Sequence, residues 1–421
     1  MGRLGRIIMK VGRKLPVMNR RLVLNTGRYQ VNQSCDQRHS RAERDRDLPH
    51  EMERRFALMK YPSCRLTVHR TRGPLPNLRR ALESGTVRIG FLGGSITEQR
   101  NGNRWPEGFV AWLTTKWPKV RWIIENAAIG ATGSDLAVFR AKRDILDRAC
   151  DLVFVEYAVN DNSTPPERRA RAREGLLRQL LASGCCDVVL VYTFMREFHA
   201  EMEAGLMPAS VADFELLADH YALNSVWAGL HAWREVRDGL MCWEEWLPDG
   251  LHPEHRGSHS YARAVIDGVV NALASKAKSK KLPVPLDSLC WQKTCVIPFA
   301  EIERTGPWTE RRWDVLSWID QVLFTTAPGA ALRGIFVGRN LVAGFVFGKA
   351  SSEIRWRIDG GEWQTSERDR PAWCGTSGWY RPLVLAENLK SGTHTFELET
   401  IHGNTPECTG CTTCIPFIAS V

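Results

Sequence analysis

The stretch GFLGGSITEQ, residues 90–99, places a serine where its hydroxyl could act as a nucleophile. It follows an apolar run, and the glycines Gly93 and Gly94 give the backbone freedom for a sharp turn that would project Ser95. We expect a helix to follow, whose first N–H groups would face a developing negative charge. A serine that only caps a helix is the alternative. The stretch is not a Gly-x-Ser-x-Gly elbow, because Thr97 stands at the last position.

A base for this serine is offered by EEWLPDGLHPEHRG, in which Asp249 and His252 are three residues apart. Pro248 and Pro253 stiffen the segment, so that the carboxylate can orient the imidazole within one short loop. His255 has no carboxylate at this spacing inside the loop, which makes His252 the better candidate. A surface turn is the alternative, because Asp-Gly is a common turn pair.

Two stretches between the serine and the histidine offer hydrogen-bond donors for an oxyanion. ENAAIGATGSD follows the apolar run 121–126, and the backbone amide of Gly130 or of Ala131 could point into a site. VEYAVNDN places Asn160 just past the apolar run 152–158, where its side-chain amide could donate. Turn chemistry for Asn160 and a helix start after Gly130 are the alternatives.

The elements that must position these residues alternate between strands and helices. Short apolar runs without strict alternation are typical of strands covered on both faces. These runs are residues 87–93, 121–126, 152–158 and 187–194. Helical patterns cover residues 107–117, 134–146 and 167–183, with further helices expected around 210–222 and 257–277. The alternation predicts a doubly wound parallel sheet, whose chemistry gathers at the carboxyl ends of the strands.

Together and in this order, the four stretches resemble the sequence blocks of the SGNH (GDSL-like) hydrolase superfamily over about residues 85–275. GGSIT is similar to the serine block, NAAIGATGS to the glycine block, YAVND to the Gly-x-Asn-Asp block and DGLHP to the Asp-x-x-His block. The resemblance implies a flavodoxin-like sheet, ester hydrolysis through an acyl-enzyme, and no metal or other cofactor. It makes Ser95 the nucleophile, His252 the base and acid, and Asp249 the orienting carboxylate.

The oxyanion donors that the resemblance implies are the Ser95 amide, the amide of Gly130 or Ala131, and the Asn160 side chain. The sequence departs from the family at Gly94, which replaces a noncatalytic Asp, and at Ala158, which replaces the Gly of the third block. The glycine block also lacks its second consecutive glycine. An alanine N–H can still serve as a donor, and which amide points inward stays open.

Composition divides the chain into four parts. We expect a basic, poorly ordered extension (residues 1–60), an SGNH-type catalytic domain (61–280), a linker (281–288) and a β-sandwich (289–421). SKAKSKKLPVPLD combines a charge run with prolines, as linkers do. Beyond it, alternating runs such as SEIRWRIDGGEWQ and GTHTFELETI are separated by turn residues, which predicts a smaller antiparallel sandwich.

The 421 residues are 43% hydrophobic and 25% charged, as in soluble globular proteins. The net charge of +10 is concentrated in residues 1–50, which hold twelve Lys or Arg and four Asp or Glu. This segment has no recognisable nucleic-acid module, so we expect no nucleic-acid partner. No apolar run could span a bilayer and no secretory h-region is present, which favours a cytoplasmic protein. The sequence does not indicate an oligomeric state.

The cysteines suggest one alternative to a metal-free protein. The run CTGCTTC spaces three thiols as C-x2-C-x2-C, at Cys408, Cys411 and Cys414, and Cys374 could supply a fourth ligand for zinc or an iron–sulfur cluster. The region has no other metal-site signature. We therefore expect free thiols or a disulfide there, and no metal.

The attached sandwich favours a saccharide ester, because several carbohydrate esterases of the resembled superfamily carry such a module. Tryptophan faces stack on sugar rings, although core packing is the alternative; the candidates are Trp356, Trp363, Trp373 and Trp379. Trp105, close to Ser95 in the sequence, is a candidate substrate wall. We see no apolar lid for a long acyl chain and therefore expect an O-acetyl group. The alternatives are a general short-chain esterase or thioesterase, a lipase-like hydrolase, an acyltransferase, and a carbohydrate-binding protein with a decayed site.

Overall fold

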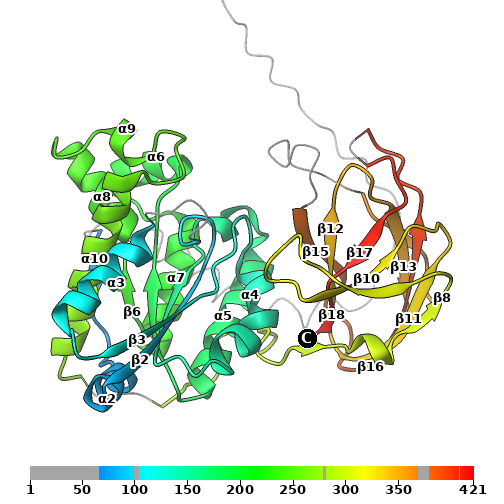
Figure 1. The fold of residues 1–421 in the computed structure, drawn as a ribbon, viewed down its shortest axis with the longest axis horizontal. Coiled ribbons are helices and arrows are strands. Elements are labelled where there is room, and N and C mark those ends of the chain that lie inside the picture. The colour runs from blue at the N-terminus through cyan, green and yellow to red at the C-terminus, as the bar shows by residue number, and fades with distance from the viewer. Residues whose placement is uncertain (1–65, 99–103, 278–280, 368–378, 407) are drawn as a thin grey trace, which may run out of the picture. The chain divides into compact units, whose positions relative to one another are not determined.

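The computed structural model describes residues 66–98, 104–277, 281–367, 379–406 and 408–421. The predicted basic extension, residues 1–60, and Cys374 lie outside the described residues. Two sets of elements follow one another along the chain (Figure 1). An α/β part ends with helix α10 (His255–Ala274), and a part made almost entirely of strands begins with β7 (Cys295–Val296).

The α/β part is built on a six-stranded sheet with the order β1-β6-β5-β4-β2-β3. Its strands are β1 (His69–Arg70), β2 (Thr86–Gly93), β3 (Arg121–Asn126), β4 (Leu152–Glu156), β5 (Asp187–Val191) and β6 (Asn224–Val226). Strands β2 to β6 pair in parallel, and β1 pairs antiparallel with β6. Counted along the chain, the five parallel strands have the order 2-1-3-4-5, which is that of flavodoxin-like sheets. The predicted doubly wound fold is confirmed.

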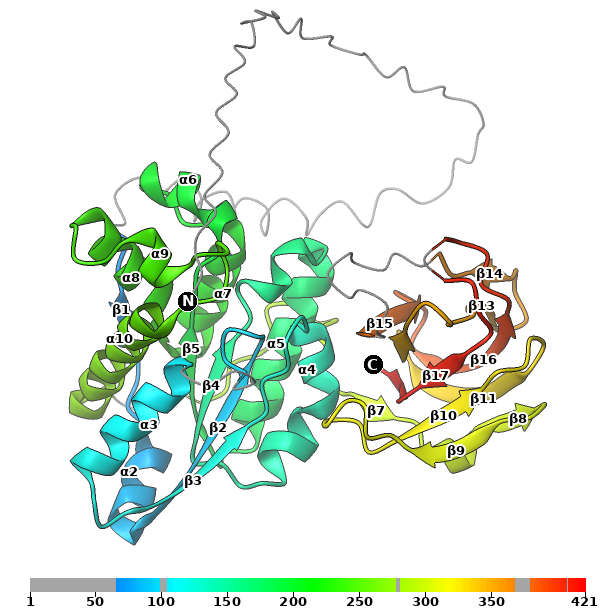
Figure 2. The same cartoon turned by 45° about the horizontal axis from the view of Figure 1, so that its top comes forward.

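Helices cover both faces of this sheet (Figures 1 and 2). They are α2 (Pro76–Ser84), α3 (Trp105–Lys116), α4 (Ser134–Ala141), α5 (Pro166–Ala182), α6 (His199–Glu203), α7 (Ala209–Tyr221), α8 (Ala228–Arg237), α9 (Trp243–Trp246) and α10. A π-helical turn, η1 (Lys142–Leu146), continues α4, and 3-10 turns lie at η2 (Asn160–Ser163) and η3 (Arg196–Phe198). Helix α3 packs on α10 and α4 packs on α5. Strands β4 and β5 are buried along their whole length, which explains their continuous apolar sequences.

The second part consists of three antiparallel sheets, with the strand orders β14-β13-β16-β11-β8, β15-β12-β18-β7 and β17-β10-β9. Besides β7, the strands are β8 (Glu303–Thr305), β9 (Thr309–Arg312), β10 (Gln321–Thr325), β11 (Ala331–Gly338), β12 (Leu341–Phe347), β13 (Glu353–Ile358), β14 (Gln364–Thr365), β15 (Trp379–Ala386), β16 (Gly392–Ile401), β17 (Thr413–Ile415) and β18 (Ile418–Ser420). One 3-10 turn, η4 (Phe299–Glu301), precedes β8. Side chains from these sheets meet in one apolar core that includes Phe336, Phe345 and Leu398. The predicted antiparallel sandwich is confirmed.

The segment predicted as a linker, residues 281–288, has no helix or strand but is bound to α5. Glu174 of α5 accepts hydrogen bonds from two of its backbone N–H groups, at 2.5 and 2.8 Å. Just beyond it, Trp291 is only 1% exposed. Gly175 makes room for this residue, because a Cβ there would lie 2.3 Å from the Trp291 carbonyl carbon. The junction is therefore part of the packed structure.

A further apolar cluster contains side chains of both parts, among them Ile129 and Leu136 of the α/β part with Leu316, Ile319 and Tyr380 of the sandwich. Burial of such apolar surface stabilises the folded state by roughly 25 cal/mol per Å².

Among the helices of the described ranges, none combines the length and the apolar character needed to cross a membrane.

Candidate active site

Ser95 lies in a tight turn directly after β2. The backbone N–H groups of Thr97 and Glu98 both donate to the carbonyl of Gly94, at 3.0 and 2.9 Å. Helix α3 begins only at Trp105, so the helix start that we predicted directly after Ser95 is absent from residues 95–98. The turn alone presents the hydroxyl, and no helix N-terminus begins at Ser95.

His252 and Asp249 share the loop between α9 and α10, and this loop reaches Ser95. Ser95 Oγ lies 2.7 Å from His252 Nε2, and His252 Nδ1 lies 2.7 Å from Asp249 Oδ2. Because an ionised Asp249 can only accept, Nδ1 carries the proton and Nε2 is left to accept from the serine hydroxyl. The predicted three residues are thus brought together in the order hydroxyl, imidazole, carboxylate.

The loop backbone holds Asp249 in this position. Asp249 Oδ1 accepts from the N–H groups of Leu251 and His252, at 2.8 and 2.7 Å. Partial burial acts to raise the pKa of Asp249, but the hydrogen bonds from His252 and Leu251 outweigh it and hold the pKa below its usual range. Gly250 supplies the required left-handed turn, with φ of 80°. The carboxylate is therefore ionised at neutral pH, as a partner of an imidazolium must be.

Asn160, at the start of η2, lies against the serine turn. A Cβ on Gly94 would come within 1.9 Å of Asn160 Oδ1, so only glycine allows this approach. In the described part of the chain, neither the Asn160 side-chain amide nor the Ser95 backbone N–H has a hydrogen-bond partner. Neither predicted donor is therefore engaged by another described residue, as an oxyanion donor requires.

The two candidate amides of the glycine block differ in their hydrogen bonding. The Gly130 N–H donates to Glu98 Oε2 at 2.9 Å, so this amide is already engaged. The Ala131 N–H has no partner among the described residues. Ala131 adopts a left-handed backbone with φ of 55°, where glycine would be at ease. The geometry therefore favours Ala131 over Gly130 as a free donor.

Two acidic residues that the sequence analysis did not single out stabilise these loops. Glu98 fixes Gly130 as described, and Asp161 connects the third block to the start of α4. Asp161 is fully buried, pairs with Arg173 at 2.7 Å and accepts from the N–H and the hydroxyl of Ser134, both at 2.8 Å. Its position directly after Asn160 in YAVND was the available signal.

Trp105 is not a substrate wall, contrary to the prediction. Its side chain is 0% exposed and makes edge-on contacts with Phe91 and Phe154, at centroid distances of 5.3 and 5.6 Å. Its Nε1–H donates to Thr97 Oγ1 at 2.9 Å. Trp105 opens α3 and shares its buried face with Phe109, four residues on, a spacing that indicates a core position.

The sandwich tryptophans differ in exposure. Trp356 is a core residue whose Nε1–H donates to the Leu385 carbonyl at 2.8 Å. Trp363 is 38% exposed and stacks against the guanidinium groups of Arg355 and Arg357, each 4.7 Å from its ring centroid. Trp379 is partly buried in β15, and Trp373 lies outside the described residues. Trp363 is thus the most exposed of the candidates that the structure describes.

In the ranges that the structure describes, no group of three or more His, Cys, Asp or Glu side chains could hold a metal ion. Cys408, Cys411 and Cys414 are described, whereas Cys374 is not. Burial raises the pKa of Cys414 to about 12, which keeps this thiol protonated.

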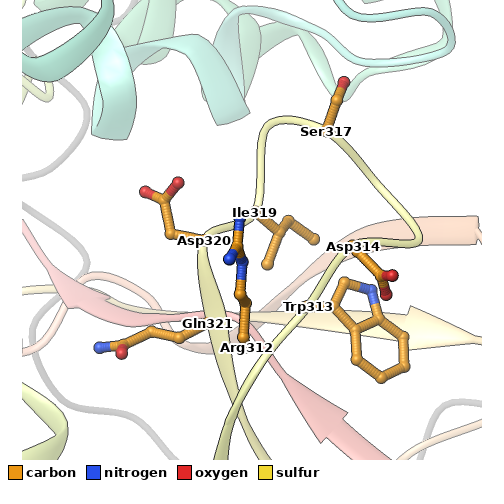
Figure 3. Close-up of a pocket in the computed structure, with 7 residues that line it drawn as sticks. All are labelled: Arg312, Trp313, Asp314, Ser317, Ile319, Asp320 and Gln321. Atoms are coloured by element: carbon orange, nitrogen blue, oxygen red, sulfur yellow. The ribbon is translucent and has the colours of Figure 1, made fainter.

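Of the hollows that the loop of residues 313–320, between β9 and β10, helps to line, two have mainly polar walls. One, of about 620 Å³, is lined by residues 312–314, 317 and 319–321, and Figure 3 shows Arg312 between Asp314 and Asp320. The other, of about 280 Å³, is lined by Trp318 and Asp320 together with Glu98 and residues 125–129. The second hollow therefore adjoins the glycine block.

Residues 91–259 match the sequence model of the GDSL-like Lipase/Acylhydrolase family. Among solved structures, the chain is similar to a two-domain esterase (CEX) active on acetylated mannans, and to the same esterase co-crystallized with mannopentaose. The two structures share 20% sequence identity with it and have TM-scores of 0.72 and 0.71; the matches cover 83% of this chain and 96% and 95% of theirs. No curated protein sequence matches.

The fold and the family match define a class: the protein is a carboxylic ester hydrolase. The match to the GDSL-like Lipase/Acylhydrolase family lies within the α/β part, over residues 91–259. The similarity to the two-domain structures extends beyond this part and shows that the fold of both parts is shared.

Proposed function

We propose that this enzyme removes O-acetyl groups from a saccharide through a Ser95-His252-Asp249 triad. The observation that carries the proposal is the pair of 2.7 Å contacts that runs from Ser95 Oγ through the imidazole to Asp249. A hydroxyl held this way can lose its proton to the imidazole as it attacks an acyl carbon.

The reaction has two halves. Ser95 Oγ bonds to the acetyl carbon while His252 Nε2 takes the hydroxyl proton, and Asp249 stabilises the resulting imidazolium. His252 then gives this proton to the sugar oxygen as the acyl–oxygen bond breaks, which leaves an acetyl-serine. A water molecule, deprotonated by His252, attacks the acetyl-serine, and acetate leaves as Ser95 regains its proton.

The oxyanion of each tetrahedral intermediate would accept from the Ser95 N–H, the Ala131 N–H and the Asn160 side-chain amide. These three donors have no partner among the described residues, whereas the Gly130 N–H is bound to Glu98. Preorganised donors of this kind supply a large share of the rate in acyl transfer.

Several features support a small acyl group on a saccharide. The His252 and Asp249 side chains are 35% and 54% exposed, so the site is open enough for a polymeric substrate. The sandwich adds an exposed tryptophan, Trp363, and aromatic faces stack on sugar rings. The similar two-domain structure is that of an esterase active on acetylated mannans. A general short-chain esterase is the second candidate, favoured by the same openness.

An acetate-release assay tests the proposal. With a panel of acetylated oligosaccharides, we expect higher kcat/KM than with p-nitrophenyl acetate. Ser95→Ala should abolish release on both kinds of substrate and leave the thermal midpoint close to that of the wild type. Ser183→Ala, at the end of α5, is the control and should keep full activity. Preference for acyl chains longer than butyrate would contradict the saccharide acetylesterase, and full activity of Ser95→Ala would contradict the triad.

A further inference from the structure

A buried carboxylate lies beneath the serine turn. Glu156 ends β4, the strand between β2 and β5, and its side chain is 0% exposed. Glu156 Oε2 accepts from the Thr97 hydroxyl at 3.0 Å, and Oε1 accepts from the Thr193 hydroxyl at 2.8 Å. Thr97 follows β2 and Thr193 follows β5, so this one carboxylate connects the carboxyl ends of three adjacent strands.

The network continues into the helix layer. The Trp105 Nε1–H donates to Thr97 Oγ1 at 2.9 Å, so the Thr97 oxygen accepts from one side and donates to Glu156 on the other. Trp105, Thr97 and Thr193 are, like Glu156, 0% exposed. A Cβ on Gly93 would lie 2.9 Å from Thr97 Oγ1, so the glycine leaves room for this hydroxyl. The polar contacts are thus built into the core, with Ser95 two residues from Thr97.

In the part of the chain that the structure describes, no Lys, Arg or His side chain forms a salt bridge with Glu156. Burial raises the pKa of Glu156 to about 7, against hydrogen bonds from Thr193, Thr97 and the Gly94 N–H that lower it, and the nearby Asp161 of η2 raises it further. The other titratable groups that interact with it are Tyr157 after β4 and Tyr261 of α10. A buried charge without a counter-ion is costly, which makes a purely structural role a poor explanation.

We propose that Glu156 is a positioning residue for the esterase reaction: its ionised carboxylate holds the Thr97 hydroxyl and thereby sets the turn that brings Ser95 Oγ to His252 Nε2. This inference rests on the proposed function. Glu156 does not touch the substrate and acts only through Thr97 and the turn of residues 94–98.

Protonation of Glu156 would reverse one of these hydrogen bonds. A neutral carboxyl must donate its proton, and the acceptors within reach are the hydroxyl oxygens of Thr97 and Thr193. Thr97 Oγ1 already accepts the Trp105 N–H. If it also accepts the proton of Glu156, the Thr97 hydroxyl can no longer donate its own hydrogen to Glu156. When Thr97 is the acceptor, the turn loses one of the contacts that hold it, and a misplacement of about 1 Å can lower a rate on the order of 10²-fold.

Glu156→Gln, an isosteric side chain that is always neutral, tests the proposal in the full-length protein. At pH 8 we expect kcat to fall by about 10- to 100-fold with KM nearly unchanged. The ratio of wild-type to variant kcat should decline toward one as the pH falls below about 6. A ratio that is flat with pH, or an unchanged kcat at pH 8, would overturn the proposal.

Asp187→Asn is a matched control. Asp187 is also a buried carboxyl, and burial raises its pKa to about 6, but its partners are Leu78 and Asn77 of α2, at the opposite end of the strands. This variant should lower the thermal midpoint and leave the pH dependence of kcat as in the wild type. An equal change of the pH profile in both variants would show a general effect of buried carboxyls and would contradict the specific role.

A pair of threonine variants covers the case in which Glu156→Gln does not fold. Thr97→Val removes the hydroxyl and should lower kcat in the same way, whereas Thr97→Ser keeps it and should restore most of the rate. Equal activity of the two variants would overturn the inference. An inactive wild type on all acetyl esters would instead overturn the proposed function.

Thermal unfolding gives a readout that does not depend on activity. The folded pKa of Glu156, about 7, lies above the ordinary value of 4.5. The stabilisation that the folded state gains from a protonated Glu156 is therefore fully present below about pH 4.5, and it is lost as the pH rises from about 4.5 to about 7. The thermal midpoint of Glu156→Gln minus that of the wild type should therefore increase as the pH rises from 5 to 8. A constant difference would contradict a buried, titrating Glu156.

Discussion

At the scale of single residues, the candidate site depends on close approaches between loops. A Cβ on Gly94 would collide with Asn160, and one on Gly130 would lie 2.7 Å from Glu98 Oε2 and 3.3 Å from Ser95 Cβ. Ala131 is held at a φ of 55°, a conformation that costs a non-glycine residue about 1–2 kcal/mol. Strain of this kind persists where the surrounding structure needs the conformation, and here it occurs at the backbone N–H that we propose as an oxyanion donor.

Asn160→Ala tests the side-chain donor of the oxyanion hole. Because the amide would bind the oxyanion more strongly than the ester carbonyl, we expect kcat to fall on the order of 10²–10³-fold with a small change in KM. Steady-state kinetics on an acetyl ester measures both constants. The control is Asn162→Ala, in the same 3-10 turn, which should stay within about twofold of the wild type. A purely elevated KM in Asn160→Ala would indicate a role in substrate binding instead.

At the scale of elements, the sequence predicts the sheet well, because strands β4 and β5 have continuous apolar runs, and the first three blocks each follow a strand, whereas the fourth lies between two helices. The side-chain direction of Trp105 was missed, since proximity to Ser95 in sequence says nothing about which helix face a residue occupies. The contact between Glu98 and Gly130 could not be predicted either, because it joins loops 32 residues apart. Glu156 had a signal, a lone carboxylate inside the apolar run VFVEYA.

At the scale of the whole molecule, the sandwich is attached through packed side chains. The predicted linker is bound to Glu174, and Trp291 is buried on α5 together with the apolar core of the α/β part. The hollow lined by Trp318, Asp320 and Glu98 places sandwich residues beside the glycine block. Loss of the sandwich should therefore affect the stability of the α/β part as well as any binding of sugar.

Two Trp→Ala variants test this attachment. Trp291→Ala empties a site that is 1% exposed and should lower the free energy of unfolding by about 3–5 kcal/mol. Trp363→Ala removes a side chain that is 38% exposed and should cost less than about 1 kcal/mol. Thermal unfolding of both variants beside the wild type gives the comparison. Equal midpoints for the two variants would contradict the packed junction.

The central claim, that Ser95 is activated by His252, is tested most directly by labelling with a fluorophosphonate. The serine oxygen displaces fluoride from phosphorus, and mass spectrometry of peptides locates the adduct. We predict a single adduct on Ser95, none in Ser95→Ala, and labelling of His252→Ala slowed on the order of 10³-fold or more. An adduct on another residue, or undiminished labelling without His252, would contradict the claim.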